Sequence, residues 1–188
     1  MPAMITETSR IIDELNRAIH GDPWHGRSAA DILDGVSAAQ ASVQPVPGVH
    51  TIWDIVRHMT AWTNEVTHRL AGHPAGDPAE GDWPQPSGVD ERAWAHDVQA
   101  LFEAHGRLVA SLESLAERAL REPTRDPRSG ETGTGVTRDV LLHGLASIMP
   151  IMPARLRFFG RSGGSDDAAA TRGCAPMRPI RAGETVGR

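Results

Sequence analysis

The fold is decided by a stretch near the middle of the chain, residues 94–115, which reads WAHDVQALFEAHGRLVASLESL. Its apolar positions, with one histidine among them, follow one another at alternating spacings of four and three: Trp94, Val98, Leu101, His105, Leu108, Leu112 and Leu115. Side chains at this spacing share one face of an α-helix. The stretch therefore predicts a helix from Asp90 to about Leu120, roughly 45 Å long at 1.5 Å per residue.

Three further long helices are predicted by the same spacing on either side of this stretch. They cover Thr6–His20, Thr51–Leu70 and a segment that begins at Thr137, and a short additional helix covers Ser28–Leu33. No segment alternates apolar and polar residues for long enough to predict a strand, and residues 123–135 are interpreted as a loop. Long helices separated by loops predict an all-α protein, an antiparallel four-helix bundle with a short extra helix after the first.

The fourth helix is the weak element of this predicted bundle. We expect Val140, Leu141 and Leu145 to lie on its buried side. Pro150 and Pro153 fall where it should continue, and a proline inside a helix costs about 3 kcal/mol. The helix should therefore be truncated or broken near residue 148. The apolar stripe that a short helix leaves uncovered predicts association of two chains, as a homodimer.

Composition and charge exclude several classes of protein. The chain has 188 residues, a formal net charge of −5 and a single cysteine, Cys174, so a disulfide framework and a cysteine-based zinc site are excluded. No apolar run approaches the ~20 residues of a membrane span, and mild acidity gives no support to nucleic-acid binding. Residues 1–10 lack the order of a signal peptide, so we expect a cytoplasmic protein. We also expect a folded domain over residues 1–160 and a disordered tail over residues 161–188, which lack any helical period.

Several short motifs, in order along the chain, resemble the DinB-like family. They are Pro23-Trp24-His25-Gly26, Asp31-Ile-Leu-Asp-Gly35, His50-Thr-Ile-Trp53 running on to His58 and Trp62, Asp82-Trp83-Pro84, and Leu141-Leu-His143-Gly144-Leu145. The resemblance covers roughly residues 10–146. It implies a four-helix bundle and a divalent-metal-dependent enzyme, a hydrolase or a thiol S-transferase, that acts on a small-molecule or thiol substrate.

The resemblance also implies a metal centre of three histidines, one on the second long helix and two on the fourth. The first of these corresponds to His58, while Ile148 and Met152 occupy the other two positions. An alkyl group cannot ligate, and a thioether is a poor ligand for metals such as Zn²⁺, Ni²⁺ or Mn²⁺. Since zinc catalysis usually needs three protein ligands, we expect that the site is lost and that the chain as written holds no metal cofactor.

A shift of reading frame near Ala146 would account for this departure. Methionine has the single codon ATG and proline has CCN, so Met149-Pro150 and Met152-Pro153 each yield alanine when the frame moves by one base. With permitted codons the shifted frame also places histidines at positions 148 and 152. We therefore hypothesise one frame slip, in the gene or in its sequencing. The alternative is a family member that has diverged naturally.

The other histidines and the tryptophans receive structural interpretations. His105 lies at a core position and His143 near the start of the fourth helix. His50, just before a helix cap, is interpreted as a capping or surface residue, with lining of the site as the alternative. Trp24, Trp53 and Trp62 are interpreted as core residues, and Glu65 with His68 as a surface pair. A non-catalytic helical bundle that acts by binding or dimerisation is the alternative function. A metal-free enzyme that binds a thiol in the bundle cleft has no support from the residues.

Overall fold

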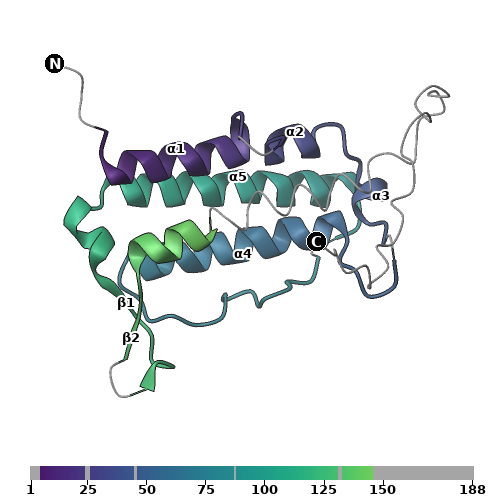
Figure 1. Ribbon diagram of the computed structural model, residues 1–188. Coiled ribbons are helices and arrows are strands. Elements are labelled where there is room, and N and C mark those ends of the chain that lie inside the picture. Colours follow the sequence, from purple (N-terminus) through teal and green to yellow (C-terminus); the bar gives the residue numbers. More distant parts are fainter. Residues whose placement is uncertain (1–4, 24–25, 45, 87, 131–132, 146–188) are drawn as a thin grey trace, which may run out of the picture.

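The computed structural model describes residues 5–23, 26–44, 46–86, 88–130 and 133–145. Its elements, in chain order, are α1 (Glu7–His20), α2 (Ala29–Leu33), α3 (Ala38–Ala41), α4 (Ile52–Leu70), α5 (Glu91–Glu113), the 3₁₀ helix η1 (Glu117–Arg121), β1 (Pro123–Arg125) and β2 (Thr134–Thr137). One more helix follows β2 directly and occupies residues 138–145, up to the end of the described part (Figure 1). The predicted all-α fold class is confirmed, whereas the predicted antiparallel arrangement does not hold for α4 and α5, which run parallel.

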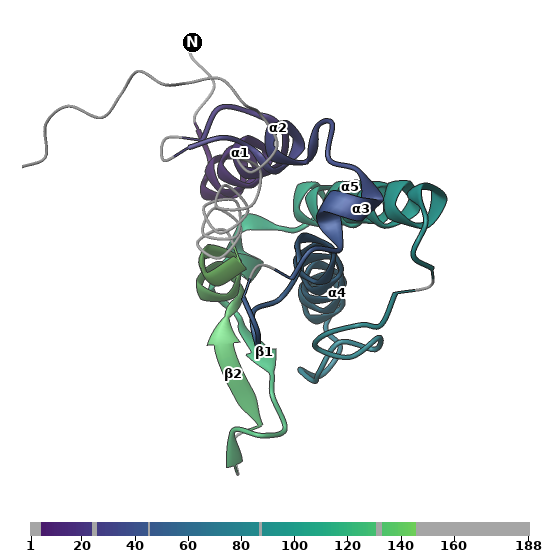
Figure 2. The same ribbon diagram turned by 90° about the vertical axis from the view of Figure 1, so that its right-hand side faces the viewer.

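Four helices surround one core: Figure 2 shows α1, α4 and helix 138–145 nearly end-on, with α5 beside them at an incline. α1 runs antiparallel to α5, because Asn16 near the end of α1 contacts His105 in the middle of α5, whereas Glu7 at the start of α1 contacts Glu117 just beyond α5. The short helices α2 and α3 follow α1, and α2 packs on α1.

α4 and α5 run in the same direction, and this feature determines where the candidate site lies. Trp53 near the start of α4 hydrogen-bonds Asp97 near the start of α5, and Asn64 further along α4 hydrogen-bonds Arg107 further along α5. Two neighbouring helices with the same direction need a connection that returns along the bundle. Residues 71–90 make this return along α4 (Figure 1), so that residues 82–84 lie against the first half of that helix.

Capping side chains encode the helix starts. Thr6, Thr51 and Asp90 each accept a hydrogen bond from the backbone N–H three residues further on. Thr51 and Asp54 form a reciprocal capping box, as predicted. The predicted helices Thr6–His20, Ser28–Leu33 and Thr51–Leu70 are confirmed to within a residue. Helix α3, which the sequence analysis missed, begins with a similar box formed by Ser37 and Gln40.

The predicted extension of α5 to Leu120 is wrong. The helix ends at Glu113 after 23 residues, or about 35 Å. The backbone turns extended at Ala116, and η1 then folds back so that Leu120 is buried and the Glu117 carboxylate accepts a hydrogen bond from the first backbone N–H of α1, that of Glu7. Residues 114–120 therefore do not continue the helix; instead they cap the start of α1 through Glu117 and bury Leu120.

A hairpin occupies residues that were predicted to be a loop. β1 and β2 pair antiparallel with an irregular register, and their three and four residues are too short to show an alternating pattern. Thr124 is buried and donates its hydroxyl to the Val136 carbonyl. A Cβ at Gly135 would lie 2.6 Å from the Thr124 hydroxyl oxygen, so the close approach of the two strands requires glycine there.

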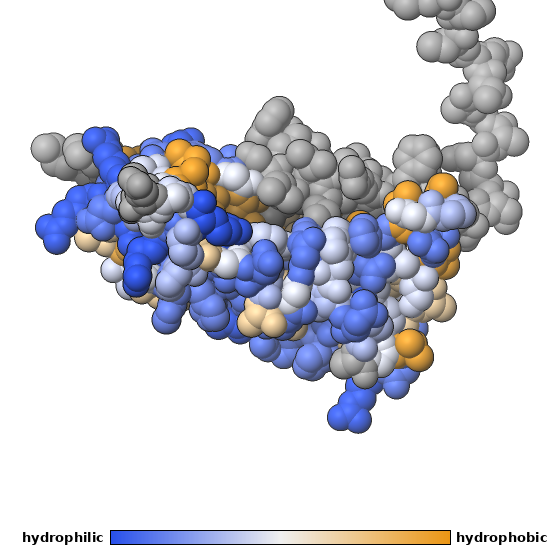
Figure 3. Space-filling model, turned by 90° about the horizontal axis from the view of Figure 1, so that it is seen from below, coloured by the Kyte–Doolittle hydropathy of each residue, from blue (hydrophilic) through white to orange (hydrophobic). Residues whose placement is uncertain are grey.

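The core is continuous across the four helices, but the predicted buried side of the fourth helix needs a correction. Val140 is 54% exposed, whereas Leu142 and Leu145 are buried and Leu141 packs against the core from its edge. The helix is therefore rotated from the predicted orientation. Among the described residues no helix is long and apolar enough to cross a membrane. The face seen from below is mostly polar, with separate hydrophobic patches (Figure 3).

Two predictions fall outside the described residues. These are the break in the fourth helix near residue 148 and the tail over residues 161–188.

Candidate functional site around His58

His58 lies on α4, where the returning segment 82–84 covers it, and its side chain is 17% exposed. The imidazole Nδ1 is 2.7 Å from the backbone carbonyl oxygen of Asp82. Because a carbonyl oxygen only accepts hydrogen bonds, Nδ1 carries the proton and the lone pair of the neutral ring lies on Nε2. A carboxylate oxygen of Asp82, 3.3 Å from the same nitrogen, favours the same tautomer.

An indole ring stands between two imidazole rings at this site. Trp83 stacks on His58 with ring centroids 4.1 Å apart and on His50 with centroids 3.4 Å apart, and both pairs are close to parallel. Both faces of Trp83 are therefore covered by histidines. His50 is exposed, in agreement with its predicted surface position, and it also lines the site by stacking on Trp83. It does not cap α4, because Thr51 does.

Trp62 closes the site one helical turn beyond His58. Its indole N–H donates to a carboxylate oxygen of Asp82 at 2.7 Å, and its ring centroid lies 6.2 Å from that of His58. The guanidinium of Arg69 lies 5.8 Å from the Trp62 ring centroid, a cation–π contact. Trp62 is thus only partly buried and is tied to the site, whereas Trp53 is buried as predicted.

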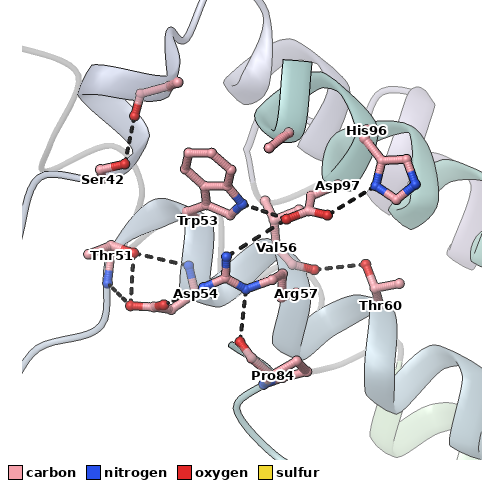
Figure 4. A network of polar contacts seen from close by, with 12 residues as sticks. Ser42, Thr51, Trp53, Asp54, Val56, Arg57, Thr60, Pro84, His96 and Asp97 are labelled. Carbon is pink, nitrogen blue, oxygen red and sulfur yellow. Dashed lines mark hydrogen bonds and ion pairs between the residues drawn. The ribbon is translucent and has the colours of Figure 1, made fainter. Parts of the chain in front are cut away.

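Arg57, the neighbour of His58, forms a buried polar network (Figure 4). Its Nε donates to the Pro84 carbonyl oxygen at 2.9 Å, and its Nη2 donates to an Asp54 carboxylate oxygen at 2.8 Å. Nη1 lies 3.7 Å from the Asp97 carboxylate. Asp97 also accepts the indole N–H of Trp53 at 2.6 Å. The network thereby connects α4, α5 and the returning segment.

The charge of Asp54 is stabilised within this network. Partial burial alone would raise its pKa, but hydrogen bonds from the backbone N–H and hydroxyl of Thr51, together with the positive charges of Arg57 and His50, hold the pKa below its ordinary value. Asp54 is therefore ionised at neutral pH and pairs with the Arg57 guanidinium.

The structure places the other predicted residues away from His58 or leaves them outside its described part. Ile148 and Met152, the two implied ligand positions, lie outside, as do Trp24, His25 and Cys174. His105 faces α1, and its Nε2 lies 2.8 Å from the side-chain oxygen of Asn16. His143 faces the glutamates of α1, with nitrogen atoms 3.7 Å from Glu7 and 4.0 Å from Glu14.

The predicted surface pair of Glu65 and His68 is wrong. Glu65 is buried and pairs with Arg69 at 2.9 Å, and the two side chains together hold the backbone N–H and carbonyl of Gly76. The i, i+4 spacing of Glu65 and Arg69 was visible in the sequence. Their burial depends on residues 71–90 returning over this face of α4, which the spacing does not reveal.

Sequence reasoning also missed Arg57 and Trp83 as site residues. The sequence placed Trp83 only within the Asp82-Trp83-Pro84 motif; a tryptophan inside a proline-rich connection was the signal that could have identified it as a site residue. Arg57 offered no signal, because an arginine next to His58 on a helix is normally solvated.

The side chains present fit a metal centre only in part. The tautomer of His58 fits, since a metal-ligating histidine usually donates its other ring N–H to a carbonyl or carboxylate oxygen. Within the described ranges, however, no group of three or more His, Cys, Asp or Glu residues lies close enough together to hold a metal ion. Three ligands cannot be assembled from His58 and the residues now at positions 148 and 152.

The fold is thus a helical bundle in which α4 and α5 run parallel and the connection between them returns over His58. Residues 24–146 match the DinB superfamily. The match covers well over half of the chain, and the protein belongs to this superfamily. No curated protein and no solved structure matches the chain.

Proposed function

We propose that this domain derives from a divalent-metal-dependent hydrolase or thiol S-transferase, and that the chain as written does not hold the metal. The observation that carries the proposal is the hydrogen bond from Nδ1 of His58 to the Asp82 carbonyl. It leaves Nε2 with a lone pair, the arrangement typical of metal-ligating histidines. Because Ile148 and Met152 stand where the resemblance implies the other ligands, we assign no catalytic step to this chain.

The extent of the family match supports the frame hypothesis. The match ends at residue 146, and the Met-Pro pairs that yield alanine in the shifted frame begin three residues later. We propose that a frame slip near Ala146 replaced the end of the fourth helix together with two ligands. The nucleotide sequence of codons 140–170 tests this directly: codons that do not permit histidines at positions 148 and 152 in the shifted frame contradict it.

The metal content of two proteins tests the role of His58. We predict that the purified chain, freed of loose metal by dialysis, contains no stoichiometric Zn²⁺, Ni²⁺ or Mn²⁺ in elemental analysis. A restored variant, with Ile148→His, Met152→His, Pro150→Ala and Pro153→Ala, should bind about one ion per chain, since three imidazoles would then be available.

Two further substitutions serve as controls for that experiment. Adding His58→Ala to the restored variant should abolish metal binding, whereas His68→Ala, at an exposed position on the same helix, should not. Stoichiometric metal in the unaltered chain that disappears with His58→Ala would contradict the proposed loss. A folded restored variant without metal would contradict the assignment of His58.

A second candidate, a bundle that acts by association without catalysis, is favoured by one feature of the surface. Val43, Val46 and Val49 lie in the connection before α4 and are 56%, 57% and 39% exposed. Exposed apolar side chains close together in sequence support a binding surface. Sedimentation velocity over a range of protein concentrations distinguishes a monomer from a homodimer.

A further inference from the structure

Three residues of α4 hold the returning segment 82–84 in place. Arg57 donates to the Pro84 carbonyl at 2.9 Å, His58 donates to the Asp82 carbonyl at 2.7 Å, and Trp62 donates to the Asp82 carboxylate at 2.7 Å. The stack of Trp83 between His50 and His58 adds contacts from its two faces. The segment is therefore positioned by side chains rather than by regular backbone pairing.

Arg57 is the best-buried of these anchors. It is 8% exposed; the Asp54 carboxylate accepts a hydrogen bond from Nη2, and the Asp97 carboxylate lies 3.7 Å from Nη1, which has no hydrogen-bond partner among the described residues. The side chain of Asp82, by contrast, is 54% exposed, so its bond to Trp62 competes with water. The planar guanidinium is held by its hydrogen bond to Asp54 and by the charge of Asp97 nearby, and this orientation directs its Nε–H to the Pro84 carbonyl.

The position of the Asp82 carbonyl decides which nitrogen of His58 carries the proton. A free neutral histidine prefers the proton on Nε2, and the carbonyl at Nδ1 reverses this preference. The carbonyl belongs to the backbone, so its position depends on what holds the neighbouring peptides. The Pro84 carbonyl is two residues away and is held by Arg57.

We propose that Arg57 is a positioning residue for His58: by holding the Pro84 carbonyl, it keeps the Asp82 carbonyl on Nδ1 and the lone pair on Nε2. The inference rests on the proposed function only because it takes Nε2 of His58 as the ligating atom. Its test needs no metal. Without Arg57, segment 82–84 loses its buried anchor, and Nε2 takes up a proton that would block it as a ligand or acceptor.

The tautomer of His58 is measured by long-range ¹H–¹⁵N correlation spectra of the full chain, at about pH 8, where an ordinary imidazole is neutral. The unaltered chain should show His58 with its proton on Nδ1. In Arg57→Met this form should fall from the major to the minor tautomer. Arg57→Lys keeps a cation between Asp54 and Asp97 but lacks the guanidinium fork, so it should stay folded and show the same shift.

Arg138→Met is the matched control. Arg138 is also a mostly buried arginine that donates to a backbone carbonyl, that of Ala119 in η1, and pairs with Glu122. Its loss should destabilise the fold and leave the His58 tautomer unchanged. This separates a positioning role from a general effect on stability.

Two results would overturn the proposal. One is an unaltered chain in which His58 carries its proton on Nε2, and the other is a folded Arg57→Met or Arg57→Lys chain that retains the Nδ1 form. Neither depends on metal binding by the restored variant. A tautomer shift in the Arg57 variants together with a folded restored variant that binds no metal would contradict the proposed function alone. Metal binding by the restored variant without a tautomer shift in the Arg57 variants would contradict the role of Arg57 alone.

Discussion

His105 is a buried histidine with a hydrogen bond at only one of its two nitrogens. Its side chain bonds Asn16 through Nε2, while Nδ1 has no hydrogen-bond partner within the described part of the chain. Burial, with a smaller contribution from the charge of His20, lowers the pKa of His105 to about 4. The residue is therefore neutral in the folded protein at neutral pH, in agreement with its predicted structural role.

This lowered pKa predicts a stability that falls on mild acidification. Above pH 6.5 the imidazole is neutral in both states; between pH 6.5 and 4 the unfolded chain binds a proton that the folded chain does not. The free energy of unfolding should thus decrease by about 2 kcal/mol between pH 7 and pH 5 through this residue. Urea unfolding at the two pH values measures it.

His105→Leu should remove that component of the pH dependence, although it also removes the bond to Asn16. His68→Gln, at an exposed position, should leave the pH dependence as it is. An unchanged difference between pH 7 and pH 5 in His105→Leu would show that other groups cause it.

At the scale of elements, local signals predicted the long helices and α2, but they did not predict α3, η1 or the hairpin. Thr51 with Asp54 and Asp90 with Ala93 mark helix starts through side-chain caps that involve only four neighbouring residues. The hairpin depends on a contact between its two strands, because the Thr124 side chain packs closely against Gly135. A contact between residues eleven positions apart leaves no periodic signal.

Two glycines should respond in opposite directions to alanine. Gly106 lies exposed inside α5 with nothing within 4 Å of an added Cβ, so Gly106→Ala should raise the free energy of unfolding by about 0.5–1 kcal/mol. Gly135→Ala would place its Cβ 2.6 Å from Thr124 and should lower it by about 1–3 kcal/mol. Urea unfolding of the two variants in parallel provides the measurement, and a stabilising Gly135→Ala would disprove the close strand contact.

At the scale of the whole molecule, the direction of α4 relative to α5 creates the site. Since the two helices run the same way, residues 71–90 must return along α4, and this path carries Asp82 and Trp83 over His58. The fourth side of the bundle is formed by helix 138–145, whose Leu142 and Leu145 complete the core. Helix 138–145 therefore packs into the same core as α1, α4 and α5.

Lengthening the fourth helix should stabilise the whole bundle. Pro150→Ala combined with Pro153→Ala lets the helix continue without the penalty of about 3 kcal/mol that each proline would impose inside it, so the longer helix should raise the free energy of unfolding. Thermal and urea unfolding measure the change without any metal. An equally stable double variant would mean that residues after 146 do not continue the helix, whatever the codons permit.

The amino-acid sequence by itself determined the long helices, most of their buried faces and the family, because apolar spacing, capping residues and motif order are properties of neighbouring positions. It also singled out His58. Only the tertiary structure decided that Trp83 stands between His50 and His58 and that Arg57 is buried under Pro84. Those contacts join residues 25 to 33 positions apart, and they form because two parallel helices force the connecting chain back along α4.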